Sequence, residues 1–102
     1  MREFDVFVPL HYNDGSPIEA RKFQRLHTRL LDHFGGVTFF PQPNKGSWKM
    51  GDVVYHDEVV VYRFVTGNLQ RARRFIAKLK EDLKRTFRQE EIFIVSRPLK
   101  RE

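Results

Sequence analysis

The order of the elements in this chain predicts an α+β domain with two helices on one face of a four-stranded antiparallel sheet. Three observations support it: an alternating apolar segment near the N-terminus, a long β-hairpin between Phe34 and Phe64, and two segments with apolar residues at helical spacing. The resulting order, β-α-β-β-α-β, is that of the ferredoxin-like two-layer sandwich. At 102 residues and 40% hydrophobic residues, residues 1–102 form a single domain, with 97–102 as a basic tail.

The first part of the chain predicts a strand followed by a helix. Apolar residues alternate from Phe4 to Leu10 with the period of two that is typical of a strand. The segment Ser16-Pro17-Ile18-Glu19 predicts a helix start, with Ser16 as the cap, proline at the first helical position and Glu19 closing a capping box. The apolar stripe runs to Phe34, and the two glycines that follow predict the end of this helix.

The second part predicts the hairpin, a helix and a last strand. We expect strands at Val37–Phe40 and Val53–Val65, joined by a loop from Pro41 to Asp52. Gly67-Asn68 precedes the second helix, and Ile92–Ser96 forms the last strand. The buried stripe of the second helix comprises Ala72, Ile76, Leu79, Leu83 and Phe87.

The sheet face opposite the helices is predicted to be unusually apolar. Strand side chains alternate, so an outward Arg63 places nearby valines on the same face, and either Ile92/Ile94 or Phe93/Val95 joins them. Large exposed apolar patches mark interfaces, although loops or the tail can also cover them. We therefore predict a homo-oligomer, most simply a dimer, in which the paired sheets can enclose a cavity for a small ligand. The predicted interface residues are Phe7, Val59, Val61 and Val65.

A second candidate site lies where the first strand ends and the third begins. His11 closes one strand and His56-Asp57-Glu58 opens its antiparallel neighbour, so these side chains are expected near each other. His56, Glu58, Tyr55 and His11 are the candidate catalytic residues of a small dimeric α+β-barrel-type enzyme. An ordinary ion pair at a strand end is the simpler interpretation. No metal is predicted, because such sites need three or four convergent ligands.

Several chemistries have no motif here. The chain has no cysteine, which excludes thiolate nucleophiles and disulfides and fits a reducing compartment. It has neither a GxGxxG segment nor a P-loop, so no nucleotide cofactor is predicted. Ser16, Ser47 and Ser96 have no neighbouring base in the sequence pattern, so no serine nucleophile is expected. These observations favour a non-catalytic binding or assembly module without cofactors.

The basic character is confined to the last third of the chain. The net charge is +6, and residues 68–102 hold eleven Lys and Arg against five Asp and Glu. The face of the second helix opposite its buried stripe carries Arg71, Arg74, Lys78 and Arg85. Nucleic-acid binding through this helix and the tail is therefore an alternative function.

Two observations count against nucleic-acid binding. The spacing predicts pairs Lys78–Asp82 and Glu81–Arg85 along the second helix, and a solvated face linked by salt bridges is the favoured interpretation. RNA binding on the sheet is disfavoured as well, because the third strand offers valines where stacking rings would be needed.

The expected location is cytoplasmic, without a membrane segment. Acidic residues within the first five positions do not fit a secretory signal. The longest aliphatic and aromatic run, Val59–Tyr62, is far too short to span a bilayer.

One set of short motifs resembles an uncharacterised group of small bacterial ferredoxin-like proteins. The motifs are Phe34-Gly35-Gly36-Val37-Thr38, Gly46-Ser47-Trp48, then Gly51 and Glu58, then Gln89-Glu90-Glu91-Ile92. In that group a Gly-Gly-x-Thr turn, a Gly/Trp pair in a loop and a strand glutamate recur, without an established activity. The resemblance implies that Thr38, Trp48 and Glu58, joined by Tyr55 and Gln89, surround one pocket for a ligand or partner.

Overall fold

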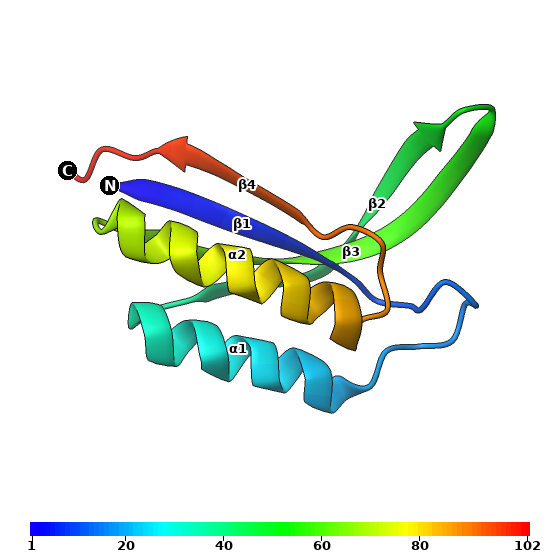
Figure 1. Ribbon diagram of the computed structural model, residues 1–102, viewed down its shortest axis with the longest axis horizontal. Helices are drawn as coiled ribbons and strands as arrows, with labels where there is room; N and C mark the ends of the chain where they lie inside the picture. Colours follow the sequence, from blue (N-terminus) through cyan, green and yellow to red (C-terminus); the bar gives the residue numbers. More distant parts are fainter.

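The computed structural model has the predicted α+β architecture (Figure 1). It describes the backbone of residues 1–102 and all side chains except those of Trp48, Met50 and Tyr55. One antiparallel sheet has the strand order β2-β3-β1-β4, and both helices lie on the same face of it. The elements are β1 (Arg2–Pro9), α1 (Ala20–Phe34), β2 (Thr38–Met50), β3 (Val53–Thr66), α2 (Leu69–Thr86) and β4 (Phe93–Pro98).

The hydrophobic core lies between the sheet and the two helices. The predicted inward residues of β3, namely Val60, Tyr62 and Phe64, are each 2% exposed, as alternation requires. They pack in one cluster with Leu30 of α1 and Leu79 of α2. Burial raises the pKa of Tyr62 to about 12, so this phenol stays protonated near neutral pH.

The start of α1 differs from the prediction. The helix begins at Ala20, and its N-cap, Glu19, makes no side-chain capping bond. Ser16 is instead held in a turn, where its N–H donates to the Asp14 carboxylate at 2.8 Å. Pro17 pairs with His11 in an isolated bridge, which keeps this segment extended. The predicted capping box is wrong because the serine has a closer partner in the turn.

Both other helix boundaries that the sequence predicts are confirmed. Gly35 ends α1 with a φ of +79°, and its N–H donates to the Leu31 carbonyl at 2.8 Å. Asn68 caps α2, because its side-chain oxygen accepts a hydrogen bond from the Arg71 N–H at 3.1 Å. Of the predicted stripe on α2, Ile76 is half-buried and the other four residues are buried.

The predicted hairpin loop is wrong, since most of it is strand. Strand β2 continues through Met50, and the turn to β3 is only Gly51-Asp52, with a Gly51 φ of +61°. The register shifts between Phe40 and Asn44, around two prolines. The two prolines, which have no N–H to donate, are tolerated because β2 is an edge strand and because residues 41–43 are not paired with β3 at the register shift.

Residues 44–58 form a two-stranded arm. Figure 1 shows this arm projecting from the body, beyond the ends of both helices. The base of the arm lies at Glu58, where the arm joins the body. The carbonyl of Glu58 accepts a hydrogen bond from the Leu10 N–H at 3.0 Å.

The last strand is also shifted from its predicted range. Strand β4 covers Phe93–Pro98, whereas Ile92 precedes it and is 1% exposed in the core. Arg97 therefore belongs to the sheet, and the basic tail beyond the strand is shorter than predicted. The tail stays next to the N-terminus, since the Leu99 N–H donates to the Met1 carbonyl at 2.9 Å.

Candidate functional site

The sheet face opposite the helices carries an apolar row that crosses all four strands. The register aligns Phe40, Val61, Phe7 and Phe93, one from each strand in spatial order, and we call these four residues the outer row. The rings of Phe7 and Phe93 lie 5.4 Å apart. Phe93 remains 62% exposed and Phe40 37% exposed, so each end of the outer row is open to solvent.

The predicted interface residues can now be placed. Val61 and Phe7 are the middle of the outer row, and Val59 and Val65 lie on the same face further along β3. The choice left open on the last strand resolves to Phe93 and Val95, because they align with Phe7 and Asp5. Whether this face forms an interface stays a prediction.

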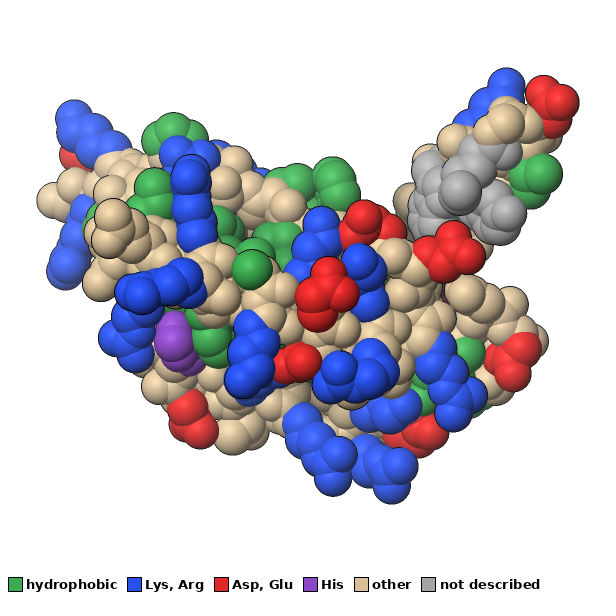
Figure 2. All heavy atoms as spheres, viewed as in Figure 1, with side chains coloured by type: hydrophobic (Ala, Val, Ile, Leu, Met, Phe, Trp, Pro, Cys, Tyr) green, Lys and Arg blue, Asp and Glu red, His purple; other side chains and the backbone are tan. Residues whose placement is uncertain are grey.

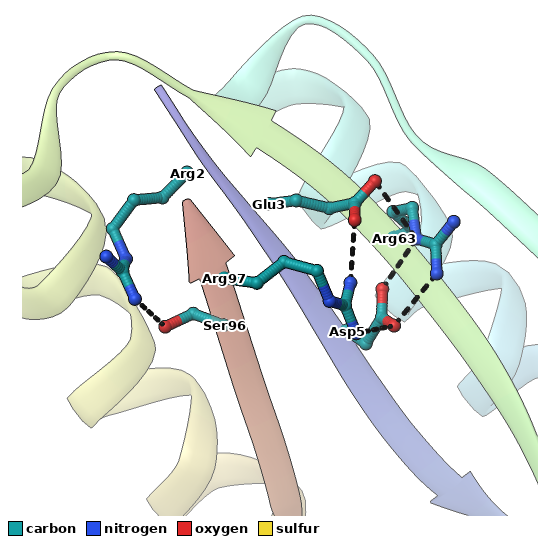
Figure 3. A network of polar contacts seen from close by, with 6 residues as sticks. All are labelled: Arg2, Glu3, Asp5, Arg63, Ser96 and Arg97. Atoms are coloured by element: carbon teal, nitrogen blue, oxygen red, sulfur yellow. Dashed lines mark hydrogen bonds and ion pairs between the residues drawn. The ribbon is translucent and has the colours of Figure 1, made fainter. Parts of the chain in front are cut away.

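A charged cluster lies beside the outer row on the same face (Figure 3). Asp5 is 4% exposed, and its two carboxylate oxygens accept hydrogen bonds from Arg63 at 2.8 and 3.0 Å and from Arg97 at 3.0 Å. Arg97 also pairs with Glu3 at 2.6 Å, and Arg63 with Glu3 at 3.3 Å. We call these four residues the charged cluster.

The charged cluster is internally balanced. The hydrogen bond from Arg63 lowers the pKa of Asp5 below its usual range, and the hydrogen bond from Arg97 lowers it further. Burial alone would raise this pKa. The sequence pattern did not reveal this cluster, because the pairing depends on the register of three strands. The available signal was the position of Asp5, an acid between the apolar residues Phe4 and Val6 of a predicted strand.

A cavity of about 580 Å³ lies at the base of the arm, and we call it the arm cavity. It brings together three predicted candidates, His11, His56 and Glu58, as antiparallel pairing of β1 and β3 implied. The side chain of the fourth, Tyr55, lies outside the described residues. The other charged or hydroxyl side chains that line it are Tyr12, Lys45, Ser47 and Asp57.

The arm cavity contains a contact that the sequence analysis missed. The Ser47 hydroxyl lies 2.9 Å from His56 Nδ1, directly across the hairpin. The expectation that no serine has a neighbouring base is therefore wrong for Ser47. It failed because the predicted loop hid the register that pairs these residues. Both side chains are exposed, so burial does not raise the reactivity of the hydroxyl.

Charges of both signs line the arm cavity. Lys45 faces Glu58 in the strand register, and Asp57 lies near His11. Burial raises the pKa of Asp57, and the charge of His11 opposes that rise. A mixed set of this kind suits a polar ligand that itself carries both positive and negative groups.

Two other residues implied by the family resemblance, Thr38 and Gln89, lie away from the arm cavity. Thr38 aligns with Arg63 on the outer face, two positions from the outer row. Gln89 follows α2, where its side-chain amide donates to the Phe87 carbonyl at 3.0 Å. The Trp48 side chain lies outside the described residues. Neither Thr38 nor Gln89 is among the residues that line the arm cavity.

The four basic residues predicted on the open face of α2 are exposed, but the ion pairs along this helix differ from the predicted ones. Asp82 pairs with Arg29 of α1 at 2.9 Å and with Arg85 at 3.2 Å, and Glu81 pairs with Lys84 at 3.3 Å. The predicted pairs Lys78–Asp82 and Glu81–Arg85 are therefore wrong. The sequence could not predict the Arg29 contact, because it joins two helices.

Two further observations concern metals and membranes. Among the described side chains, no three His, Asp or Glu residues lie close enough together to hold a metal ion. No helix in the described part of the chain is long and apolar enough to cross a bilayer.

Comparison with known proteins finds a similarity of fold. No protein-family model matches the chain, and no curated protein sequence matches it. The structure is similar to that of a phage SAM lyase solved in complex with S-methyl-5'-thioadenosine, with a TM-score of 0.70. The match covers 94% of this chain and 79% of that chain at 13% sequence identity, and it supports the ferredoxin-like fold.

Proposed function

We propose that this chain is an assembly module in which two copies pack through the outer faces of their sheets and bind a small polar ligand at the arm cavity. The observation that carries the assembly is the outer row, which places two exposed phenylalanines and two further apolar residues across the whole sheet. Sheets pack face to face at about 10 Å, a distance that buries such rows.

A second copy is the simplest cover for this face. A two-fold axis brings the same patch to both sides, so each outer row meets another apolar row. Removing a phenylalanine side chain from water is worth about 1.5–3 kcal/mol. Phe93 is still 62% exposed, so each copy has about 1–2 kcal/mol to gain at this residue alone.

The charged cluster is compatible with burial in this interface. Its two acids and two arginines already pair with one another, so association leaves none of these charges without a partner. Its position on one side of the outer row makes the face asymmetric, which favours one register of the two sheets over others.

Sedimentation velocity of the whole protein tests the assembly. We expect a dimer at micromolar concentration and a shift to monomer in Phe93→Ser. Two serines per dimer remove about 2–4 kcal/mol, on the order of a hundredfold in Kd. Leu31→Ser is the matched control, because Leu31 is 43% exposed but lies on α1, and this variant should stay dimeric. A monomeric wild-type protein at these concentrations would contradict the proposal.

A second candidate function is cleavage of S-adenosylmethionine. The observation that favours it is the similarity of fold to a SAM lyase bound to S-methyl-5'-thioadenosine, together with the lining of the arm cavity. The substrate is a sulfonium that also carries an amino group and a carboxylate. Glu58 and Asp57 suit the positively charged groups of this substrate, and Lys45 suits its carboxylate.

In this reaction the bond between the sulfonium sulfur and the amino-acid side chain breaks. The electron pair stays on sulfur, which becomes the neutral thioether of S-methyl-5'-thioadenosine. A carboxylate oxygen of the same substrate forms a bond to the carbon that sulfur leaves, so the amino-acid part is released as homoserine lactone. The protein's part is to bind the substrate at the arm cavity, with Glu58 beside the ammonium group, which stays charged throughout, and to hold the carboxylate against the reacting carbon.

Chromatography of S-adenosylmethionine incubated with the protein tests this candidate. We expect S-methyl-5'-thioadenosine to accumulate faster than in buffer, and Glu58→Gln to lower kcat/KM about tenfold, mainly by raising KM, because it removes a charge that binds the substrate. Asp52→Asn is the control, because it makes the same change at the turn of the arm, away from the cavity lining. A rate equal to that in buffer, or one unchanged in Glu58→Gln, would exclude it.

A further inference from the structure

The helical side of the molecule, opposite the outer row, carries a second and strongly basic surface. A groove of about 680 Å³ lies between α1 and α2. Its lining includes Arg21, Arg25 and Arg29 from α1 and Arg71 from α2, against one acid, Asp32. Figure 2 shows basic side chains spread over this side of the molecule. The sequence predicted a basic surface on α2 alone, and the structure adds Arg21, Arg25 and Arg29 of α1 to it.

Ion pairs neutralise only some of the cations on this surface. Asp82 engages Arg29 and Arg85, Glu81 engages Lys84, and Glu91 engages Lys80 at 3.0 Å. Within the described side chains, six other cations on the two helices have no carboxylate oxygen within the 4.0 Å of an ion pair, namely Arg21, Arg25, Arg71, Arg73, Arg74 and Lys78. Five of them follow each other at intervals of about one turn along their helix, and we call these five, Arg21, Arg25, Arg71, Arg74 and Lys78, the free cations.

The free cations form two rows rather than one cluster. Arg21 and Arg25 are one turn apart on α1, and Arg71, Arg74 and Lys78 follow successive turns of α2. Rows with a repeat of about 5–6 Å suit a chain of phosphates better than a single phosphate. All five are exposed, as sliding contact with a long polyanion requires.

The aromatic side chains of the groove, on which nucleic-acid bases could stack, already pack against other side chains. The Phe75 ring stacks on His33 at 3.9 Å between centroids and lies 5.3 Å from the guanidinium carbon of Arg29. Burial lowers the pKa of His33, and Arg71 and Arg29 add to this effect, so its ring is neutral at neutral pH. The groove therefore offers charge without an available aromatic platform.

We propose that this helical face binds the phosphate backbone of nucleic acid without sequence preference. The proposal is independent of the assembly and of the arm cavity, since those lie on the outer sheet face and at the base of the arm. The contacts are charge-assisted bonds from the free cations to phosphate oxygens, so binding weakens steeply with salt.

Fluorescence polarisation with labelled DNA duplexes of about 20 base pairs, titrated over a range of salt concentrations, tests the proposal. We expect two unrelated sequences to bind alike. The triple variant Arg25→Gln, Arg71→Gln, Arg74→Gln should weaken binding at least tenfold at 0.1 M salt and lower the salt slope by about three. Circular dichroism checks its fold, and replacement of the same three arginines by lysine should keep binding near the wild-type level.

The control removes the same charge elsewhere. Lys49→Gln, Lys100→Gln, Arg101→Gln takes three cations from the arm and the tail and should bind within about twofold of wild type. An equal loss in both triple variants would mean that only net charge matters and would overturn the proposal. Displacement of the duplex by micromolar pyrophosphate would overturn it too, in favour of a small-anion site.

Discussion

At the scale of single residues, Asp5 shows how a charge can sit within an apolar sheet. Its carboxylate is almost fully buried, yet it stays ionised because Arg63 and Arg97 supply hydrogen bonds to both oxygens. The two arginines are only partly buried and keep contact with water, which lowers the cost of placing the charges there.

Replacing Asp5 by asparagine should destabilise the fold by about 2 kcal/mol at pH 7. The amide cannot pair with two guanidinium groups, but Glu3 remains nearby and the arginines are partly solvated, so the loss falls below that of a fully buried pair. Urea unfolding measures it, with Asp52→Asn at the exposed turn as the control. Equal stability of Asp5→Asn and wild type would contradict the structural role of the cluster.

The same residue predicts a pH dependence. The pKa of Asp5 is lower in the folded protein than in the unfolded chain, so its contribution is present above the unfolded value and is lost as pH falls through the folded one. Wild-type stability should therefore fall below about pH 4, and Asp5→Asn should lose less over that range.

At the scale of elements, local signals predicted some boundaries and missed others. Asn68 and Gly35 act through bonds to their own helix, so their roles could be read from neighbouring residues. The role of Ser16 could not be predicted from its neighbours, because the same residues allow either a helix cap or a turn. The bridge between His11 and Pro17 keeps this segment extended, so Ser16 lies in the turn.

In the arm cavity, too, one contact could be predicted from the sequence and another could not. Antiparallel pairing of β1 and β3 follows from the element order, so the meeting of His11 with His56 and Glu58 was predictable. The contact of Ser47 with His56 required the hairpin register, which the two prolines of β2 concealed.

Alanine at the two proposed cap positions should give different results. Asn68→Ala removes a bond to the Arg71 N–H and should cost about 1 kcal/mol of unfolding free energy. Ser16→Ala should cost no more than about 0.5 kcal/mol, since Ser16 caps no helix and is exposed. Thermal unfolding compares the two, and Asn68→Asp should keep most of the stability. A larger loss in Ser16→Ala would favour the helix start that the sequence predicted.

At the scale of the whole molecule, three surfaces face different directions. The outer row lies on the open side of the sheet, and the free cations lie on the helices. The arm extends beyond both layers (Figure 1). An isolated two-stranded hairpin is marginally stable in water, and this arm exposes Val53 and Val54 at its end. Contact with a second copy would stabilise it, which links the arm to the proposed assembly.

Hydrogen exchange should therefore reveal a dependence of the arm on protein concentration. Amides in residues 46–56 have no third strand beside them, so they should exchange quickly in dilute protein and slowly where the dimer forms. Amides of β1 should show no such change, because they are paired on both sides within one copy. In Phe93→Ser the arm should exchange quickly at every concentration, since the sheets no longer associate. Arm protection that is the same in both proteins and at all concentrations would mean that the hairpin is stable by itself and that the arm takes no part in assembly.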